Sequence, residues 1–272
     1  MSAFKLVIPI DFSNASREAI QYATNLSNND KDQIILVHVL HDSSEKDAKN
    51  KLNELVKEEL NSFKGATRTA VITGEVEDDI GAFAEAEKAN FIVMGVHENT
   101  FFDKLLGSRA MNIIEYTKVP FITVQEGSKF EKIEKIAMTI DLDNDSIQVV
   151  KAAASLAQNL GAKLLLVAGD HSDENFKRQI HSNLKVASNY LNERSIESSI
   201  ELIDRHNFVD HIVELCEERG VDMISATFYL KSINLFSPKF VQHLIANDLK
   251  LPVLTVDAQI FTKGAQFPFI TT

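Results

Sequence analysis

The sequence predicts an α/β protein made of two tandem, doubly wound domains, each with a five-stranded parallel sheet. Two observations support this prediction. The two halves of the chain repeat one another at a nearly constant offset, which indicates a duplicated structural unit. Within each half, short apolar runs alternate with helical patterns, and this alternation implies βαβ units with right-handed crossovers and a parallel sheet.

Three pairs of matching segments establish the repeat. They are KLVIPIDFSNASREAIQYATNLS (5–27) with KIAMTIDLDNDSIQVVKAAASLA (135–157) at an offset of 130, EAEKANFIVMG (85–95) with EERGVDMISAT (217–227) at 132, and VPFITV (119–124) with LPVLTV (251–256) at 132. An Ile-Asp pair and the Asn-x-Ser that follows it fall in register in the first pair. Three matches at one spacing are hard to obtain by chance.

The strands are expected to be nearly continuous apolar runs such as Ile34-Ile35-Leu36-Val37, because both faces of such a sheet are covered by helices. The expected strands lie near residues 4–10, 33–40, 67–73, 91–95 and 120–124, and again near 132–140, 163–168, 197–203, 222–226 and 252–256. The expected helices of the first half lie near 14–28, 45–63, 77–88 and 108–117. The last of these carries an apolar stripe at i, i+3, i+4, i+7 that includes Ile113 and Thr117.

The chain is expected to divide into a first domain over residues 1–127, a second over 131–257, and a tail over 258–272. The linker between the domains is short, so we expect the two to pack together. Pairing of the two final strands, 120–124 with 252–256, would make an intramolecular pseudo-dimer and would protect two sheet edges. The tail could cover another surface or support a further homodimer.

Composition excludes several classes of protein. The formal net charge is -11, which disfavours non-specific binding to nucleic acid or to anionic membranes. No apolar run approaches the roughly 20 residues that span a bilayer, and the N-terminus lacks the pattern of a signal peptide. A single cysteine, Cys216, lies on an apolar helical stripe and is expected to be a buried, structural thiol. These features favour the reducing cytoplasm.

Ligands of open doubly wound sheets bind at the carboxyl ends of the strands. In the first half, residues 9–13, beginning with Pro9, end the first strand, and Met94-Gly95 end the fourth. Gly107-Ser108 then open a helix, where free N–H groups, a hydroxyl and the positive end of the helix dipole suit a phosphate. The alternative interpretation is an ordinary serine N-cap.

Together, the Asp11 position, the Leu36-Val37-His38-Val39 strand, Ile92-Val93-Met94-Gly95 and Gly107-Ser108 resemble the universal stress protein domain. The resemblance covers nearly the whole chain, twice. It implies a five-stranded parallel sheet and, in many members of that family, an ATP site. It further implies contacts of Asp11 with ribose or phosphates, of Val39 with adenine, of Pro9, Met94 and Gly95 with the pocket, and of Gly107 and Ser108 with phosphates. The implied ligand is ATP or AMP with Mg²⁺, in the first half only.

The sequence departs from the family's G-x2-G-x9-G-[ST] loop. Glu98 stands in place of the second glycine, the spacing from Gly95 to Gly107 is one residue shorter, and Phe101-Phe102 replace small residues. In the second half, Thr227 stands opposite Gly95, and Lys239-Phe240 stand opposite Gly107-Ser108. Pro238 there removes an N–H donor that a phosphate would use, so the second half is expected to have lost the nucleotide site while Asp141 remains.

Four functions stay open on the sequence alone. The first is a stress-response regulator that responds to an adenine nucleotide, and the second is a nucleotide-free scaffold that binds partner proteins. The third is slow ATP hydrolysis or adenylyl transfer, although no catalytic site can be named; the fourth is a pocket remodelled for another small ligand. Two histidine groups, His38 with His41 and His206 with His211 and Glu214, are expected to be solvent-exposed rather than metal ligands.

Overall fold

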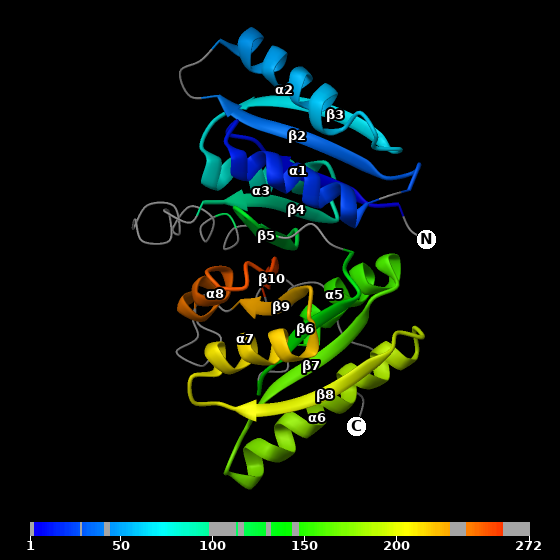
Figure 1. The fold of residues 1–272 in the computed structure, drawn as a ribbon, viewed down its shortest axis with the longest axis vertical. Helices are drawn as coiled ribbons and strands as arrows, with labels where there is room; N and C mark the ends of the chain where they lie inside the picture. The colour runs from blue at the N-terminus through cyan, green and yellow to red at the C-terminus, as the bar shows by residue number, and fades with distance from the viewer. Residues whose placement is uncertain are drawn as a thin grey trace.

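The chain forms one elongated α/β body in which two similar halves stand one above the other (Figure 1). The computed structural model describes residues 3–27, 29–40, 44–97, 113, 117–128, 132–142, 147–228 and 238–257. No helix among these residues is long and apolar enough to cross a membrane.

The order of strands and helices follows the sequence prediction. The first half contains β1 (Lys5–Pro9), α1 (Asn14–Leu26), β2 (Gln33–Leu40), α2 (Glu45–Glu59), β3 (Ala66–Thr73), α3 (Val76–Ala86), β4 (Phe91–Val96) and β5 (Phe121–Gln125). The second half contains β6 (Lys135–Ile140), α5 (Ile147–Leu160), β7 (Lys163–Asp170), α6 (Glu174–Asn192), β8 (Ser198–Asp204), α7 (Phe208–Arg219), β9 (Met223–Phe228), α8 (Pro238–Ile245) and β10 (Val253–Asp257). All ten predicted strands are confirmed within a few residues.

Parts of the prediction lie outside the described residues. The helix expected near 108–117 is one of them, except for Ile113 and Thr117, which are both buried, as the apolar stripe predicts. The tail over 258–272 is another. The thiol of Cys216 is buried as expected, and burial raises its pKa to about 12.

The two halves share one topology and join into a single sheet. The strand order is β3-β2-β1-β4-β5-β10-β9-β6-β7-β8, so each half has the doubly wound order and the two expected sheets form one ten-stranded sheet. All neighbouring strands are parallel except β5 and β10, which pair antiparallel. The predicted pairing of the two final strands is therefore confirmed.

The junction between the halves has an approximate two-fold symmetry. Thr123 Oγ1 donates a hydrogen bond to the carbonyl oxygen of Val253 at 3.3 Å, and Thr255 Oγ1 donates to that of Phe121 at the same distance. The two threonines occupy matching positions of the VPFITV and LPVLTV segments. The same patch thus meets itself, as in a symmetric dimer, but within one chain.

Helices cover both faces of the sheet, and each face has its own apolar core. One core lies under α1, α2, α5 and α6 and includes Leu6, Leu36 and Met138. The other lies under α3, α7 and α8 and includes Val7, Val37 and Ile224. Each core contains residues of both halves, so apolar packing as well as strand pairing stabilises the junction.

Candidate functional site

A pocket of about 210 Å³ lies at the carboxyl ends of β1, β2 and β4. The strand order reverses between β1 and β4, and this switch point is where open α/β sheets bind ligands. Five of the residues singled out from the sequence line the pocket together, namely Pro9, Asp11, Val39, Met94 and Gly95. The other two, Gly107 and Ser108, lie outside the described residues, and a ligand-binding role stays a prediction for all seven.

The inner wall of the pocket is apolar. Val37 and Val39 come from β2, and Val76 and Ile80 come from the first two turns of α3. Ile80 is fully buried, and Val39 nearly so. A wall of this kind suits a flat, weakly polar ring better than a charged group.

Asp11 lies at the mouth of the pocket, in the turn between β1 and α1. Its Oδ1 accepts hydrogen bonds from the backbone N–H of Ser13, at 2.9 Å, and from the Ser13 hydroxyl. Ser13 also caps α1, since its hydroxyl accepts from the backbone N–H of Ser16 at 3.3 Å. Burial by itself would raise the pKa of Asp11, but hydrogen bonds from Ser13 and Ser16 and the nearby His97 outweigh it and lower that pKa. Asp11 is therefore ionised and can only accept hydrogen bonds.

Phe12 fixes the turn that carries Asp11. It has a φ of 66°, a left-handed conformation that is strained for a residue with a Cβ. Its ring packs 4.7 Å from the imidazole of His38, whose Nδ1 lies 2.7 Å from the carbonyl oxygen of Ile10. A carbonyl only accepts, so Nδ1 carries the proton. The expectation that His38 is solvent-exposed is wrong, because its side chain is half-buried, and His38 also lines the pocket.

Gly95 lets α1 approach the sheet. A Cβ at this position would lie 1.9 Å from the carbonyl oxygen of Ala15 and 2.2 Å from its carbonyl carbon. Both atoms are backbone, so no side-chain rotation would relieve the overlap. Gly95 is thus needed to pack the first turn of α1, and the capped Asp11 turn, against β4.

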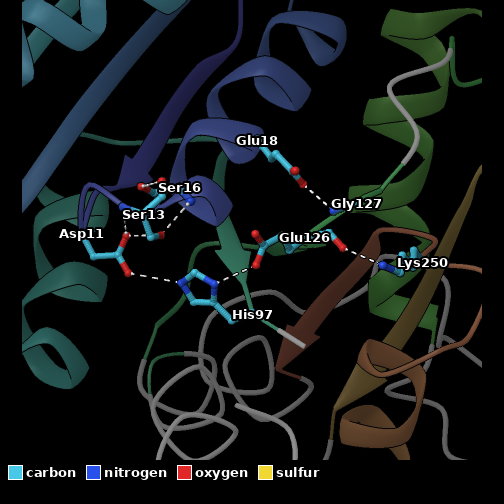
Figure 2. A network of polar contacts seen from close by, with 8 residues as sticks. All are labelled: Asp11, Ser13, Ser16, Glu18, His97, Glu126, Gly127 and Lys250. Atoms are coloured by element: carbon cyan, nitrogen blue, oxygen red, sulfur yellow. Dashed lines mark hydrogen bonds and ion pairs between the residues drawn. The ribbon is translucent and has the colours of Figure 1, made fainter. Parts of the chain in front are cut away.

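His97, which sequence analysis did not single out, lies between Asp11 of the pocket and Glu126. It directly follows β4, and its Nδ1 lies 3.0 Å from Oε2 of Glu126 while its Nε2 lies 4.0 Å from Oδ2 of Asp11 (Figure 2). His97 is only two residues beyond Gly95, so the reasoning that selected Met94 and Gly95 could have reached it. Glu126 follows the last strand of the first half and carries no comparable sequence signal.

Comparison with known proteins identifies the family. Residues 3–125 match the model of the universal stress protein family. The chain is 30% identical over 142 residues to universal stress protein MJ0531 of Methanocaldococcus jannaschii, a match that covers 46% of this chain and 84% of that protein. This chain belongs to the universal stress protein family.

Solved structures of other universal stress proteins show the same fold over both halves. One from Archaeoglobus fulgidus has a TM-score of 0.71 at 15% identity, over 95% of this chain and 100% of that one. A putative universal stress protein from Pseudomonas aeruginosa has a TM-score of 0.60 at 13% identity, over 95% of each chain. At such identity these likenesses show the fold alone.

The second half of this universal stress protein differs from the first at the positions equivalent to Val39 and Val76. The register of the sheet makes Gly169 of β7 the equivalent of Val39 of β2. Phe208 is the first residue of α7, as Val76 is the first residue of α3. The Phe208 ring lies over Gly169, where an added Cβ would be 3.8 Å from Cδ2 of the ring. Phe208 is buried and packs 6.0 Å from the ring of Phe240. A smaller strand residue and a larger helix residue thus stand in the second half where Val39 and Val76 line the pocket of the first half.

Asp141, the counterpart of Asp11, has different surroundings. It is buried, and its Oδ1 accepts from the backbone N–H of Leu142 at 2.7 Å. Asn183 of α6, also buried, donates its amide to the carbonyl oxygen of Asp141 at 2.7 Å. The same type of residue is thus exposed beside the pocket in the first half and buried against backbone groups in the second.

Of the other histidines, His206 and His211 both contact Asp204. His206 Nδ1 lies 2.9 Å from Oδ1 of Asp204, and His211 Nδ1 lies 3.2 Å from the carbonyl oxygen of the same residue. Within the described ranges, no group of three or more potential ligands is arranged to hold a metal ion. His41 lies outside those ranges.

His171, next to the end of β7, makes stability depend on pH. Burial, with a smaller contribution from the charge of Arg205, lowers the pKa of His171 below its ordinary 6.5. The native state then binds fewer protons than the unfolded state just below pH 6.5, so stability falls as the pH falls through that range. We expect His171→Leu to flatten the pH dependence of the unfolding midpoint there, measured by circular dichroism. His181→Leu, on an exposed position of α6, is the control, and equal slopes in the two variants would contradict this assignment.

Proposed function

We propose that this universal stress protein binds an adenine nucleotide, ATP or AMP with Mg²⁺, in its first half and acts as a nucleotide-responsive stress regulator rather than a metabolic enzyme. The observation that carries the proposal is the pocket itself. An apolar wall and an ionised, preorganised aspartate meet at the switch point of the sheet, where ligands of such folds bind.

The apolar wall supports a site for the adenine base. Val39 of β2 lines the pocket together with Val76 and Ile80 of α3. A purine ring buries mostly apolar surface, so this wall gives affinity, while backbone groups at the strand ends supply the few polar contacts that fix orientation.

Asp11 supports a site for the ribose hydroxyls or for a metal ion bound to the phosphates. Its Oδ1 is engaged by Ser13, while its side chain remains 64% exposed and so can accept from a ligand. A carboxylate oxygen is also a preferred ligand of Mg²⁺. The phosphates themselves we assign to Gly107 and Ser108 through the family resemblance.

The test is calorimetric titration of the full chain with MgATP and with AMP. We expect about one equivalent to bind to the wild type, because Phe208 stands in the second half where Val76 lines the pocket of the first. Val76→Phe copies Phe208 into the first half and should weaken binding by roughly 100-fold or more, because the ring would occupy the place of the base. Val186→Phe makes the same change on an exposed position of α6 and should leave affinity unchanged.

Two results would overturn the proposal. If Val76→Phe bound as well as wild type while its unfolding midpoint was preserved, the nucleotide would not be in this pocket. If wild type did not bind at millimolar nucleotide, the first half would be ligand-free, and the chain would be better explained as a scaffold for partner proteins.

A further inference from the structure

A continuous series of contacts links the pocket of the first half to the second half (Figure 2). It begins at Asp11, reaches His97 at 4.0 Å, and continues to the Glu126 carboxylate at 3.0 Å. Lys250, which lies just before β10, then donates its Nζ to the backbone carbonyl oxygen of Glu126 at 3.1 Å. The four residues come from the ends of β1, β4 and β5 and from the second half.

The segment that carries Glu126 is held from several sides. Gly127 donates its backbone N–H to the Glu18 carboxylate of α1 at 2.7 Å. Gln125 donates its side-chain amide to the carbonyl oxygen of Asn247 at 2.9 Å, and Ser128 donates its hydroxyl to that of Lys250 at 2.8 Å. Residues 125–128, which we call the junction segment, therefore contact both α1 beside the pocket and the loop that leads into β10.

We propose that His97 is a positioning residue that couples occupancy of the first-half pocket to the junction segment, and through it to the second half. The inference rests on the proposed nucleotide site and adds its regulation. Its basis is the placement of one imidazole between a carboxylate of the pocket and a carboxylate of the junction.

The geometry makes the two contacts of His97 unequal. At 3.0 Å the Glu126 contact is a hydrogen bond, and since an ionised carboxylate only accepts, Nδ1 carries its proton. At 4.0 Å the Asp11 contact is too long for a hydrogen bond, and it is an attraction between charges in the form of the ring that carries a proton on Nε2 as well as on Nδ1. A ligand hydroxyl or Mg²⁺ that engages Asp11 reduces the attraction of that carboxylate for the imidazolium. His97 then interacts more strongly with Glu126, and this stabilises the contacts of the junction segment.

Such coupling must act in both directions. If ligand binding stabilises the contacts around Lys250 by some factor, then loss of those contacts must lower the affinity for the ligand by the same factor. This reciprocity distinguishes coupling from a structural role of His97, because a structural residue would change stability without linking the two sites.

The first measurement is hydrogen exchange of backbone amides in 125–128 and 247–252, with and without saturating MgATP. We expect the ligand to slow exchange there by about fivefold in the wild type. His97→Asn keeps an amide donor near the position of Nδ1 but removes the second ring nitrogen. It should retain the fold and lose the ligand-dependent protection. His97→Ala should lose that protection too, and the two variants together separate coupling from simple destabilisation.

The second measurement is MgATP affinity of junction variants by calorimetry. Introduced alone, Lys250→Met should weaken MgATP binding by about fivefold. Added to His97→Asn, it should have no further effect on MgATP binding. Lys163→Met is the control, because Lys163 lies on β7, three strands from β10, and pairs with Glu197 at 2.8 Å. This variant should leave the affinity for MgATP unchanged.

The outcomes separate the two proposals. Binding of MgATP with no change in junction exchange, or equal effects of Lys250→Met with and without His97, would overturn the coupling and leave the nucleotide site standing. Failure of the wild type to bind MgATP would overturn the proposed function and the coupling with it.

Discussion

Gly95→Ala is expected to lower the midpoint of thermal unfolding by roughly 6–12 °C. The added Cβ would lie 1.9 Å from the carbonyl oxygen of Ala15, so α1 must move off β4 or β4 must bend. Overpacking of this kind costs about 3 kcal/mol when backbone is the obstacle, and each kcal/mol shifts the midpoint of a protein of this size by about 2–4 °C. Calorimetry of the full chain measures the effect.

The matched control is Gly169→Ala, at a strand end of the second half. There the nearest atom to the new Cβ is Cβ of Arg205 at 3.2 Å, and a shift of a few tenths of an ångström relieves it. We expect a loss below about 1 kcal/mol. Equal midpoints of thermal unfolding for the two variants would show that α1 does not pack directly against Gly95. The substitution would also displace the Asp11 turn, so MgATP affinity should fall in Gly95→Ala alone.

Asn247→Ala is expected to destabilise the protein by about 3–4 kcal/mol, through the junction between the halves. The buried Asn247 amide donates to the carbonyl oxygens of Leu244 and Leu251, both at 2.8 Å, and its Oδ1 accepts from the backbone N–H of Leu251 at 2.9 Å. Alanine would leave the two Leu251 groups without that partner, while the carbonyl oxygen of Leu244 keeps the backbone N–H of residue 247 at 3.2 Å, and each buried unsatisfied group costs about 1–3 kcal/mol. Chemical denaturation measures the loss.

Asn192→Ala is the control, since Asn192 is an exposed residue at the end of α6 and its replacement should change stability by less than about 0.5 kcal/mol. In Asn247→Ala, hydrogen exchange should rise first in the loop that leads into β10. A stable Asn247→Ala variant with unchanged exchange there would contradict the structural account of the junction.

Much of the fold follows from the sequence alone, because it depends on apolar periodicity and on the order of strands and helices along the chain. The apolar run at Ile34–Val37 forms a strand buried on both faces, as its composition predicts. The VPFITV and LPVLTV segments are similar because they occupy equivalent places at one symmetric junction. The position of the pocket follows as well, since a doubly wound order fixes its switch point.

Other residues that decide the structure carry no local signal. Asp32 is fully buried and accepts the backbone N–H of Phe4 at 2.7 Å, across 28 residues of sequence. Asn247, itself buried, likewise organises the loop that leads into β10. A buried polar residue of this kind is recognised only when the backbone groups that it satisfies are placed beside it.

The sequence by itself thus determined the fold class, the duplication and the edge of the sheet where a ligand would bind, because these depend on periodicity and on chain order. Only the tertiary structure showed that Gly169 and Phe208 of the second half take the places of Val39 and Val76, which line the pocket of the first half. It alone also placed His97 between Asp11 and Glu126. The physical reason is that side-chain volumes and charges compensate one another through space, between residues that no local pattern connects.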